Sequence, residues 1–275
     1  HEGLVHERIQ QESLRRHQRG PDPSRPRRYV RLGCLAVLPT ACERTLEGHD
    51  NWVVAVVPFL EDKVISGAFD NTIKVWSTAS GACEQTLQTP SAAVFSLLVF
   101  GDLLFVGMGN NNIDVINTTS WTVERTLGGH TGTVRALVMC GDLLISGSSD
   151  GTIRVWNTAT WACVRTLAGH GLTVRSVAAA GGKLISGSDD NTIKIWSTTT
   201  WTCERTLTDH TNLLALALTP DGRKLLSGSN DRTVKIWELD RGITLHSYRW
   251  RKARSIDKVA FLPKAKGGLR VMAKS

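Results

Sequence analysis

The sequence predicts an all-β protein built from a repeated unit of four short strands, and three observations lead to this prediction. A His, a Ser-Gly-x-x-Asp turn and a Trp follow one another in the same order at four places in the chain. The closing Trp residues are 80, 40 and 41 residues apart, so one copy in the first gap lacks the signature. Self-similarity at a fixed period is typical of repeat proteins, in which each unit buries its apolar face against its neighbours.

Each unit has the period-2 pattern of strands, and the unit that begins at His130 shows it in order. Its four strand segments are expected at 134–138, 143–147, 152–156 and 164–167. Gly, Asp and Asn lie between these segments, where turns need the dihedral angles that these residues tolerate. Four short strands at this spacing form one antiparallel sheet. Radial repetition of such sheets protects their edges, which predicts a β-propeller.

The chain is expected to contain a polar, basic tail or linker at 1–28 and a propeller at 29–275. Complete units are expected at 49–87, 90–127, 130–167, 170–207 and 210–245. The segment 256–275 resembles the first two strands of a further unit, and 29–46 resembles the last two. Together they predict a closing blade, so six blades are favoured. A seven-bladed parent that has lost a segment remains the alternative.

The spacing from His to Trp, the Ser-Gly-x-x-Asp turn and the four-strand rhythm resemble the WD40-repeat β-propeller family over roughly residues 30–275. The Asp that gives the family its name is absent, because each Trp is followed by Ser77, Asn157, Ser197 or Glu238. The repeats are also similar to those of ubiquitin-ligase receptors that join a WD40 propeller to an F-box or RING module. In some of these receptors, arginines on the rim bind phosphorylated motifs.

The resemblance implies a structural role for the repeated His, Asp, Ser and Trp residues, which would form one buried hydrogen-bond network per blade. Indole N–H only donates and a carboxylate only accepts, so such a chain can be satisfied internally. The expected sets are His49–Asp70–Ser66–Trp76, His130–Asp150–Ser146–Trp156, His170–Asp190–Ser186–Trp196 and His210–Asp231–Ser227–Trp237.

The repeats offer no recognisable catalytic motif. A set repeated four times around a ring is not four active sites, and the second unit replaces it with Pro90, Asn110 and Ile116. Gly107-Met-Gly matches only the start of a phosphate-binding glycine loop and precedes no helix. The expectation is therefore a non-enzymatic protein without a metal or cofactor.

The resemblance also places candidate partner-binding residues on the rim, where the first strand begins and the turn after the second strand projects. The third and fifth residues after each His and the residue before each Asp fall there. These positions give the candidate set Arg135, Arg175, Lys258, Trp52, Phe69 and Phe95, with Ala215 in the fifth unit. Two guanidinium groups can bind a carboxylate or phosphate, and the aromatic rings can anchor a hydrophobic side chain. Alternatively, the arginines pair with local acids such as Asp189.

Three Trp residues define a second candidate surface. Trp121, Trp161 and Trp201 occupy the turn after the third strand in three adjacent units, where the first and fifth units have Gly81 and Gly242. They would form an exposed apolar strip for a second domain or subunit. Alternatively, each ring lies flat over its own outer strand.

Charge and cysteine usage limit the partners and the compartment. The net charge of +8 comes from the ends, since residues 249–275 carry +8 and residues 29–248 carry −3. The six cysteines are expected to be reduced, as in intracellular proteins of the cytoplasm or nucleus. The best hypothesis is a protein-interaction scaffold that binds acidic or phosphorylated peptides. The alternative is a ribonucleoprotein scaffold that contacts RNA through the basic ends.

Overall fold

The structure is a computed structural model that describes residues 44–90, 92–211, 213–219, 221–239, 241, 243–249, 256, 258–263 and 269–274. The chain divides into two units, residues 1–44 and residues 45–275. All the described strands belong to the second unit, which contains the repeats.

Five four-stranded antiparallel sheets and one two-stranded sheet form this unit. The first sheet is β1 (Val53–Phe59), β2 (Lys63–Ala68), β3 (Thr72–Ser77) and β4 (Cys83–Gln88). The second is β5 (Val94–Phe100), β6 (Leu103–Met108), β7 (Ile113–Asn117) and β8 (Val123–Leu127). The third is β9 (Val134–Cys140), β10 (Leu143–Ser148), β11 (Ile153–Asn157) and β12 (Cys163–Leu167). The fourth is β13 (Val174–Ala180), β14 (Lys183–Ser188), β15 (Ile193–Ser197) and β16 (Cys203–Leu207). The fifth is β17 (Leu213–Leu218), β18 (Lys224–Ser229), β19 (Thr233–Glu238) and β20 (Ile243–Arg249), and the two-stranded sheet is β21 (Lys258–Pro263) with β22 (Leu269–Lys274).

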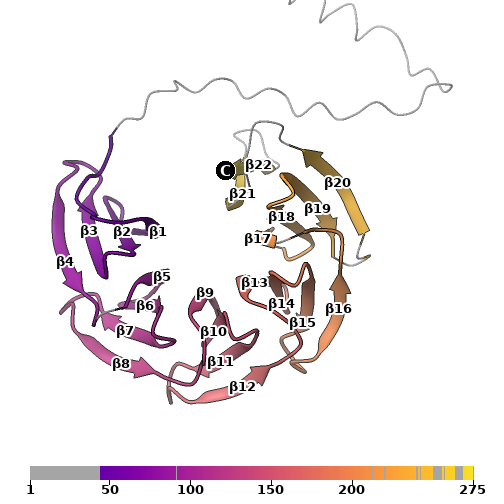
Figure 1. Cartoon of the computed structure of the whole chain (residues 1–275), viewed down its shortest axis with the longest axis horizontal. Coiled ribbons are helices and arrows are strands. Elements are labelled where there is room, and N and C mark those ends of the chain that lie inside the picture. Colours follow the sequence, from indigo (N-terminus) through magenta and orange to yellow (C-terminus); the bar gives the residue numbers. More distant parts are fainter. Residues whose placement is uncertain are drawn as a thin grey trace, which may run out of the picture. The chain divides into compact units, whose positions relative to one another are not determined.

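The strands of each four-stranded sheet pair in chain order, and the sheets follow one another as the blades of a propeller. The first strands contact one another from β1 through β5, β9, β13 and β17 to β21, and each fourth strand is outermost (Figure 1). The prediction of an all-β propeller with four-stranded antiparallel blades is confirmed. The sixth blade, predicted from 256–275 and 29–46, rests largely on residues outside the described ranges, so the blade count stays a prediction.

The blades adhere through apolar faces that meet at each junction. One core cluster joins Ile65 and Val75 of the first blade to Val94 and Leu104 of the second. The other junctions repeat this arrangement with the equivalent residues. The core is therefore a series of interfaces between sheets, as the repeat pattern predicts.

The glycine of each Ser-Gly pair permits this close approach. A Cβ atom on Gly67 would lie 2.3 Å from Val94 Cγ1, and one on Gly147 would lie 2.7 Å from Val174 Cγ1. Both distances are shorter than a carbon–carbon contact can be. The second strand of one blade and the first strand of the next can therefore meet only where the side chain is absent.

Candidate functional site

The repeated polar residues of the third blade form a continuous chain of hydrogen bonds. Trp156 Nε1–H donates to Ser146 Oγ at 2.9 Å. Ser146 Oγ lies 2.8 Å from His130 Nε2, and His130 Nδ1 lies 2.8 Å from Asp150 Oδ2. The equivalent distances in the first, fourth and fifth blades lie between 2.6 and 2.9 Å. Each set that the resemblance implied is thus brought together in one place.

The protonation states of Asp150 and His130 determine which group donates in each hydrogen bond of the network. Burial raises the pKa of the Asp150 carboxyl, but hydrogen bonds from Thr152, Thr131 and His130 outweigh burial and lower that pKa to about 2. Burial lowers the pKa of His130, and the bond to Asp150 offsets only part of this effect. A neutral imidazole therefore donates through Nδ1 to the carboxylate and accepts the Ser146 hydroxyl proton at Nε2, which satisfies every group.

The same carboxylate also fixes the backbone around it. Asp150 Oδ1 accepts from the backbone N–H and the hydroxyl of Thr152, and Oδ2 accepts from the backbone N–H of Thr131. The network thereby ties the loop before the first strand to the turn before the third. The polar groups of the network form hydrogen bonds with one another and with the adjacent backbone, as expected of a structural role.

The second blade replaces this network with apolar groups. Ile116 is buried where the other blades have Trp, and Val106 is buried where they have the network Ser. Pro90 stands in place of His. Because both partners of each bond are replaced together, no buried donor of the network is stranded, a change that is nearly neutral for stability.

The predicted rim residues of the first three blades lie in one row. The Trp52 and Phe69 rings have centroids 6.1 Å apart, and the Phe69 and Phe95 rings 4.8 Å apart. The guanidinium carbon of Arg135 lies 4.4 Å from the centroid of Phe95, within the range of a cation–π contact. We call these four side chains the aromatic–arginine row. Trp52 is 75% exposed, and the other three are half-buried.

A β-bulge explains why this position of the first strand projects. Val134 pairs with Ser148 and Ala136 pairs with Gly147, so Arg135 lies between them without a cross-strand partner. Phe95 and Arg175 occupy the same unpaired place in their own strands. A bulge re-aims the side chain of the extra residue, which brings these side chains to the rim.

The two arginines differ in their partners. Arg175 Nε donates to both carboxylate oxygens of Asp189, at 2.8 and 3.0 Å, as the alternative of local pairing predicted. Arg135 Nε donates to Ser149 Oγ at 3.1 Å. Burial lowers the pKa of Arg135, the positive charge of Arg175 adds to this effect, and Asp189 opposes it. The charges of both Arg175 and Asp189 therefore act on Arg135.

The rim position predicted in the fifth unit was wrong by one residue. In the fifth blade Leu213 pairs with Ser229 and Ala215 pairs with Gly228, so the bulge falls at residue 214. Ala215 is buried instead. The reason is that the loop after His210 is one residue shorter than in the other blades.

Lys258, the rim candidate of the last unit, is the first residue of β21. A Cβ atom on Gly228 would meet Ile256 and Val259 of the next sheet. In the other blades a Cβ atom on the equivalent glycine would meet two residues of the next sheet. One is the residue just before the bulge, and the other lies two positions after the bulge. By this count the rim position of the last unit is residue 257, which lies outside the described residues, so this position stays a prediction. The side chain of Lys258 lies outside the described residues.

The expected strip of exposed tryptophans was also wrong. Trp121, Trp161 and Trp201 are half-buried, and each packs against the core cluster at the junction with the preceding blade. Trp121 meets Phe59 edge-on with ring centroids 5.6 Å apart, and Trp161 lies 6.3 Å from Phe105. The rings therefore fill spaces between blades and do not lie flat over their own outer strands.

The described residues define which other kinds of site the chain presents. Within the described ranges there is no group of three or more His, Cys, Asp or Glu side chains that could hold a metal ion. Cys83, Cys140, Cys163 and Cys203 are free thiols. No helix in the described part of the chain could span a membrane. The basic segment 1–28 and about half of 249–275 lie outside the described residues.

Comparison with known proteins agrees with this architecture. The WD40 family model (WD domain, G-beta repeat) matches residues 40–77, 121–157, 161–197 and 201–238, together more than half of the chain. The chain therefore belongs to the WD40-repeat family, whose propellers are protein-interaction scaffolds and generally not enzymes. The unmatched interval 78–120 contains the first three strands of the second blade, which has lost the network.

The F-box/WD repeat-containing protein 7 of Drosophila melanogaster is a similar protein. It is 38% identical to this chain over 58 residues, which are 21% of this chain and 4% of the fly protein. The chain thus matches a small part of that protein, within the repeats.

Proposed function

We propose that this propeller binds acidic or phosphorylated peptide motifs of other proteins on the rim formed by the aromatic–arginine row. The observation that carries the proposal is the contact of Arg135 with Phe95, which joins a cation to an apolar surface that continues to Trp52. A peptide with an acidic group and a neighbouring hydrophobic side chain complements both parts.

Arg135 supplies the recognition of the anion. Its bond to Ser149 uses Nε, and its contact with Phe95 uses the face of the guanidinium. Neither contact uses the Nη–H donors, which can bind a carboxylate or a phosphate in the bidentate manner typical of arginine. Stacking on Phe95 holds the guanidinium in one orientation, so less side-chain entropy is lost on binding.

Trp52 supplies an apolar anchor at the other end of the row. Its ring is 75% exposed, which is unusual for so large an apolar side chain, and its backbone N–H is bound by Asn51 Oδ1 at 2.8 Å. Exposed aromatic side chains next to arginine are the residue types that dominate the binding energy of interfaces.

The proposal extends to the assembly in which such a receptor acts. The similarity to an F-box/WD repeat-containing protein supports a role in a ubiquitin-ligase or signalling complex, with this propeller as the substrate-binding part. The small share of the fly protein that matches leaves this extension to experiment.

An oriented peptide library tests the proposed function. The library fixes Glu, phosphoserine or phosphothreonine at the centre and varies the flanking positions, and the purified chain is used to select from it. We expect enrichment of anionic peptides with a flanking hydrophobe, and loss of that enrichment in Arg135→Gln and Trp52→Ala.

Arg165→Gln is the matched control. Arg165 lies on the outer strand β12, is exposed and donates to the backbone carbonyl of Val164. Arg165→Gln therefore removes one positive charge at a place distant from the rim. Selection that falls equally in Arg165→Gln and Arg135→Gln reports only net charge and contradicts the proposal. So does a library from which the wild-type chain enriches no anionic peptide.

A further inference from the structure

The junctions between the first four blades are closed by a tryptophan from the later blade of each pair. Trp121, Trp161 and Trp201 belong to the turns after β7, β11 and β15, and each backbone N–H closes its turn in the same way. Trp201 packs against the cluster that contains Leu143 and Val155 of the third blade. The same position of the sheet is thus filled three times by an indole ring.

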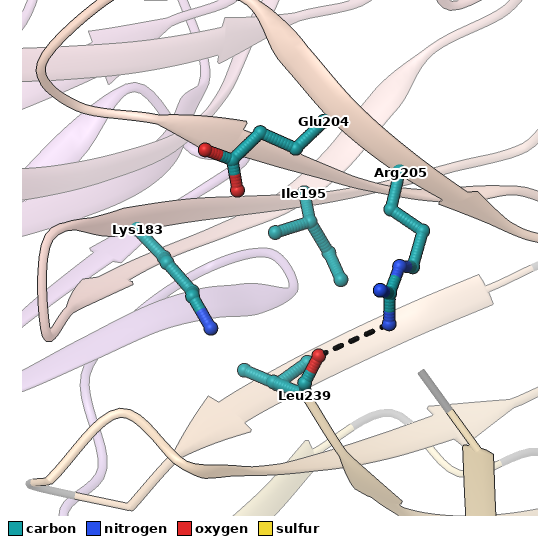
Figure 2. A pocket seen from close by; sticks show the side chains of 5 residues that line it. All are labelled: Lys183, Ile195, Glu204, Arg205 and Leu239. Carbon is teal, nitrogen blue, oxygen red and sulfur yellow. Dashed lines mark hydrogen bonds between the residues drawn. The ribbon is translucent and has the colours of Figure 1, made fainter. Parts of the chain in front are cut away.

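The junction between the fourth and fifth blades lacks this ring. Trp201 follows Trp196 of the fourth blade by five residues. The residue that follows Trp237 of the fifth blade by five residues is Gly242. At this junction the structure contains a cavity of about 230 Å³ (Figure 2). Its lining residues are Lys183, Ile195, Glu204, Arg205 and Leu239.

The lining residues show that this cavity is the equivalent of the tryptophan sites. Lys183 is the first residue of β14, at the place that Leu143 takes in the preceding blade. Ile195 lies within β15, at the place that Val155 takes there. Val155 belongs to the cluster against which both Leu143 and Trp201 pack. In the fifth blade the residue at the sequence position of Trp201 is Gly242, which has no side chain.

Leu239 takes only part of the vacated space. It replaces the smaller Thr198 of the fourth blade, is 2% exposed and packs in the cluster that contains Ile195. The cavity that remains is smaller than the roughly 300–1,000 Å³ of sites for drug-sized ligands. Its size fits a single side chain.

The backbone of the occupied sites shows how firmly the rings are held. Trp121, Trp161 and Trp201 have φ of 55°, 61° and 60°, in the left-handed region that large side chains avoid. Gly81, at the same position in the first blade, has φ of 79° without this strain. Such strain persists only where the surroundings determine the conformation, so the turn and the contacts of each ring together hold these residues in place.

We propose that the cavity between the fourth and fifth blades binds a tryptophan side chain of a partner protein, which takes the place of the missing internal one. Ile195 and Leu239 give the apolar surface, and Glu204 offers a carboxylate acceptor for the indole N–H. Arg205 closes the other side, where Nη1 donates to the carbonyl oxygen of Leu239 at 3.3 Å (Figure 2). This site is at the opposite end of the strands from the rim and does not depend on the proposed function.

Methyl NMR of the intact 275-residue chain tests this proposal, with N-acetyl-tryptophanamide as the probe. We expect ring-current shifts at the methyl groups of Ile195 and Leu239 and unchanged signals at Ile145, which is buried in the third blade. N-acetyl-leucinamide at the same concentration should cause much smaller shifts. Shifts absent at Ile195 and Leu239, or equal for both probes, overturn the proposal.

Three variants connect the shifts to the cavity. Gly242→Trp supplies an internal ring and should abolish the shifts, whereas Trp201→Gly opens a second site and should extend them to Val155. Glu204→Gln alters an exposed side chain, so the fold is retained, and it should weaken binding about threefold to tenfold because the charged acceptor is lost. If Gly242→Trp does not fold, Glu204→Gln decides, and unchanged binding in that variant contradicts the proposal.

Discussion

Arg175 is neutralised by its neighbour Asp189, whose two carboxylate oxygens accept from Nε at 2.8 and 3.0 Å. The third blade has Ser149 at the equivalent position, so Arg135 bonds to a neutral hydroxyl instead. One arginine of the rim thus has an internal anion, and the other does not. On this difference rests our proposal that Arg135 is the principal anion-binding residue and that Asp189 competes with a bound anion for Arg175.

The first prediction concerns this competition. Asp189→Asn removes a negative charge and releases Arg175 from its ion pair. The affinity for a doubly charged phosphate should therefore increase more than the affinity for a carboxylate. Because the pair is partly exposed and such pairs are weak, we expect an increase in phosphopeptide affinity of about threefold to tenfold. Fluorescence polarisation with the best library peptide measures it. Unchanged phosphopeptide affinity would show that Arg175 does not contact the anion.

The second prediction concerns the buried network. Asp150→Ala leaves His130 Nδ1 and the backbone N–H groups of Thr131 and Thr152 without their acceptor. Of these residues only His130 is buried, since Thr152 is half-buried and Thr131 is exposed, so the free energy of unfolding should fall by about 1–3 kcal/mol. Urea denaturation measures the change.

The second blade supplies the control for this substitution. Asn110 stands at the position of Asp150 but is exposed and accepts only from the backbone N–H of Asn112 at 3.2 Å. Asn110→Ala should change the free energy of unfolding by about 0.5 kcal/mol or less. Equal effects of the two substitutions would mean that the network adds nothing to the turn itself.

The third prediction is a loss of stability in acid that occurs in two stages. Burial lowers the pKa values of His130, His170 and His210 below 6.5, so the unfolded chain binds protons first as the pH falls. The contribution of these neutral histidines to the free energy of unfolding is complete above pH 6.5 and is lost as the pH falls below it. The network carboxyls have pKa values of about 2, against 3.8 in the unfolded chain.

Each carboxylate therefore contributes about 2 kcal/mol above pH 4, which is lost as the pH falls from about 4 to 2. Thermal unfolding between pH 8 and pH 3 measures both stages. We expect Tm to decrease first below pH 6.5 and more steeply below pH 4. A Tm that is constant from pH 7 to pH 4.5 would contradict the assignment of neutral, buried histidines.

The sequence predicted the sheets well because their signals are local. The alternation along 152–156 and the turn residues beside it are short-range patterns, and the structure has β11 at 153–157. The resemblance to the family also identified His130, Ser146, Asp150 and Trp156 as residues that meet, because strand pairing brings the same positions of each repeat into contact.

The surface residues were harder to predict because they depend on register and on side-chain direction. One residue less after His210 moved the rim position from Ala215 to residue 214, and the last unit has no such His from which to count to Lys258. The half-buried tryptophans depend on a positive φ, which sends the ring toward the preceding blade. No pattern in the sequence marks a Trp for a conformation that Gly ordinarily takes.

The fourth prediction concerns the contact between blades at the Ser-Gly pair. Gly147→Ala places a Cβ atom 2.7 Å from Val174 Cγ1, so the fourth blade must shift outward. Overpacking of this kind costs about 1–3 kcal/mol. Val174→Ala should recover part of the loss, giving a coupling energy of about 1 kcal/mol or more in a double-mutant cycle by urea unfolding. Simple additivity would show that the blades do not meet here.

The last prediction separates backbone strain from ring packing at Trp161. Removal of the ring should destabilise the junction with the second blade, where it contacts Phe105, by about 3 kcal/mol in Trp161→Ala. Trp161→Gly loses the same packing but relieves the positive φ of 61°, which costs an L-residue about 1–2 kcal/mol. The Gly variant should therefore unfold at higher urea concentration than the Ala variant, although helix and strand propensities alone favour Ala. The opposite order would mean that residue 161 leaves the left-handed region once its ring is gone, so that packing of the ring imposes the turn conformation.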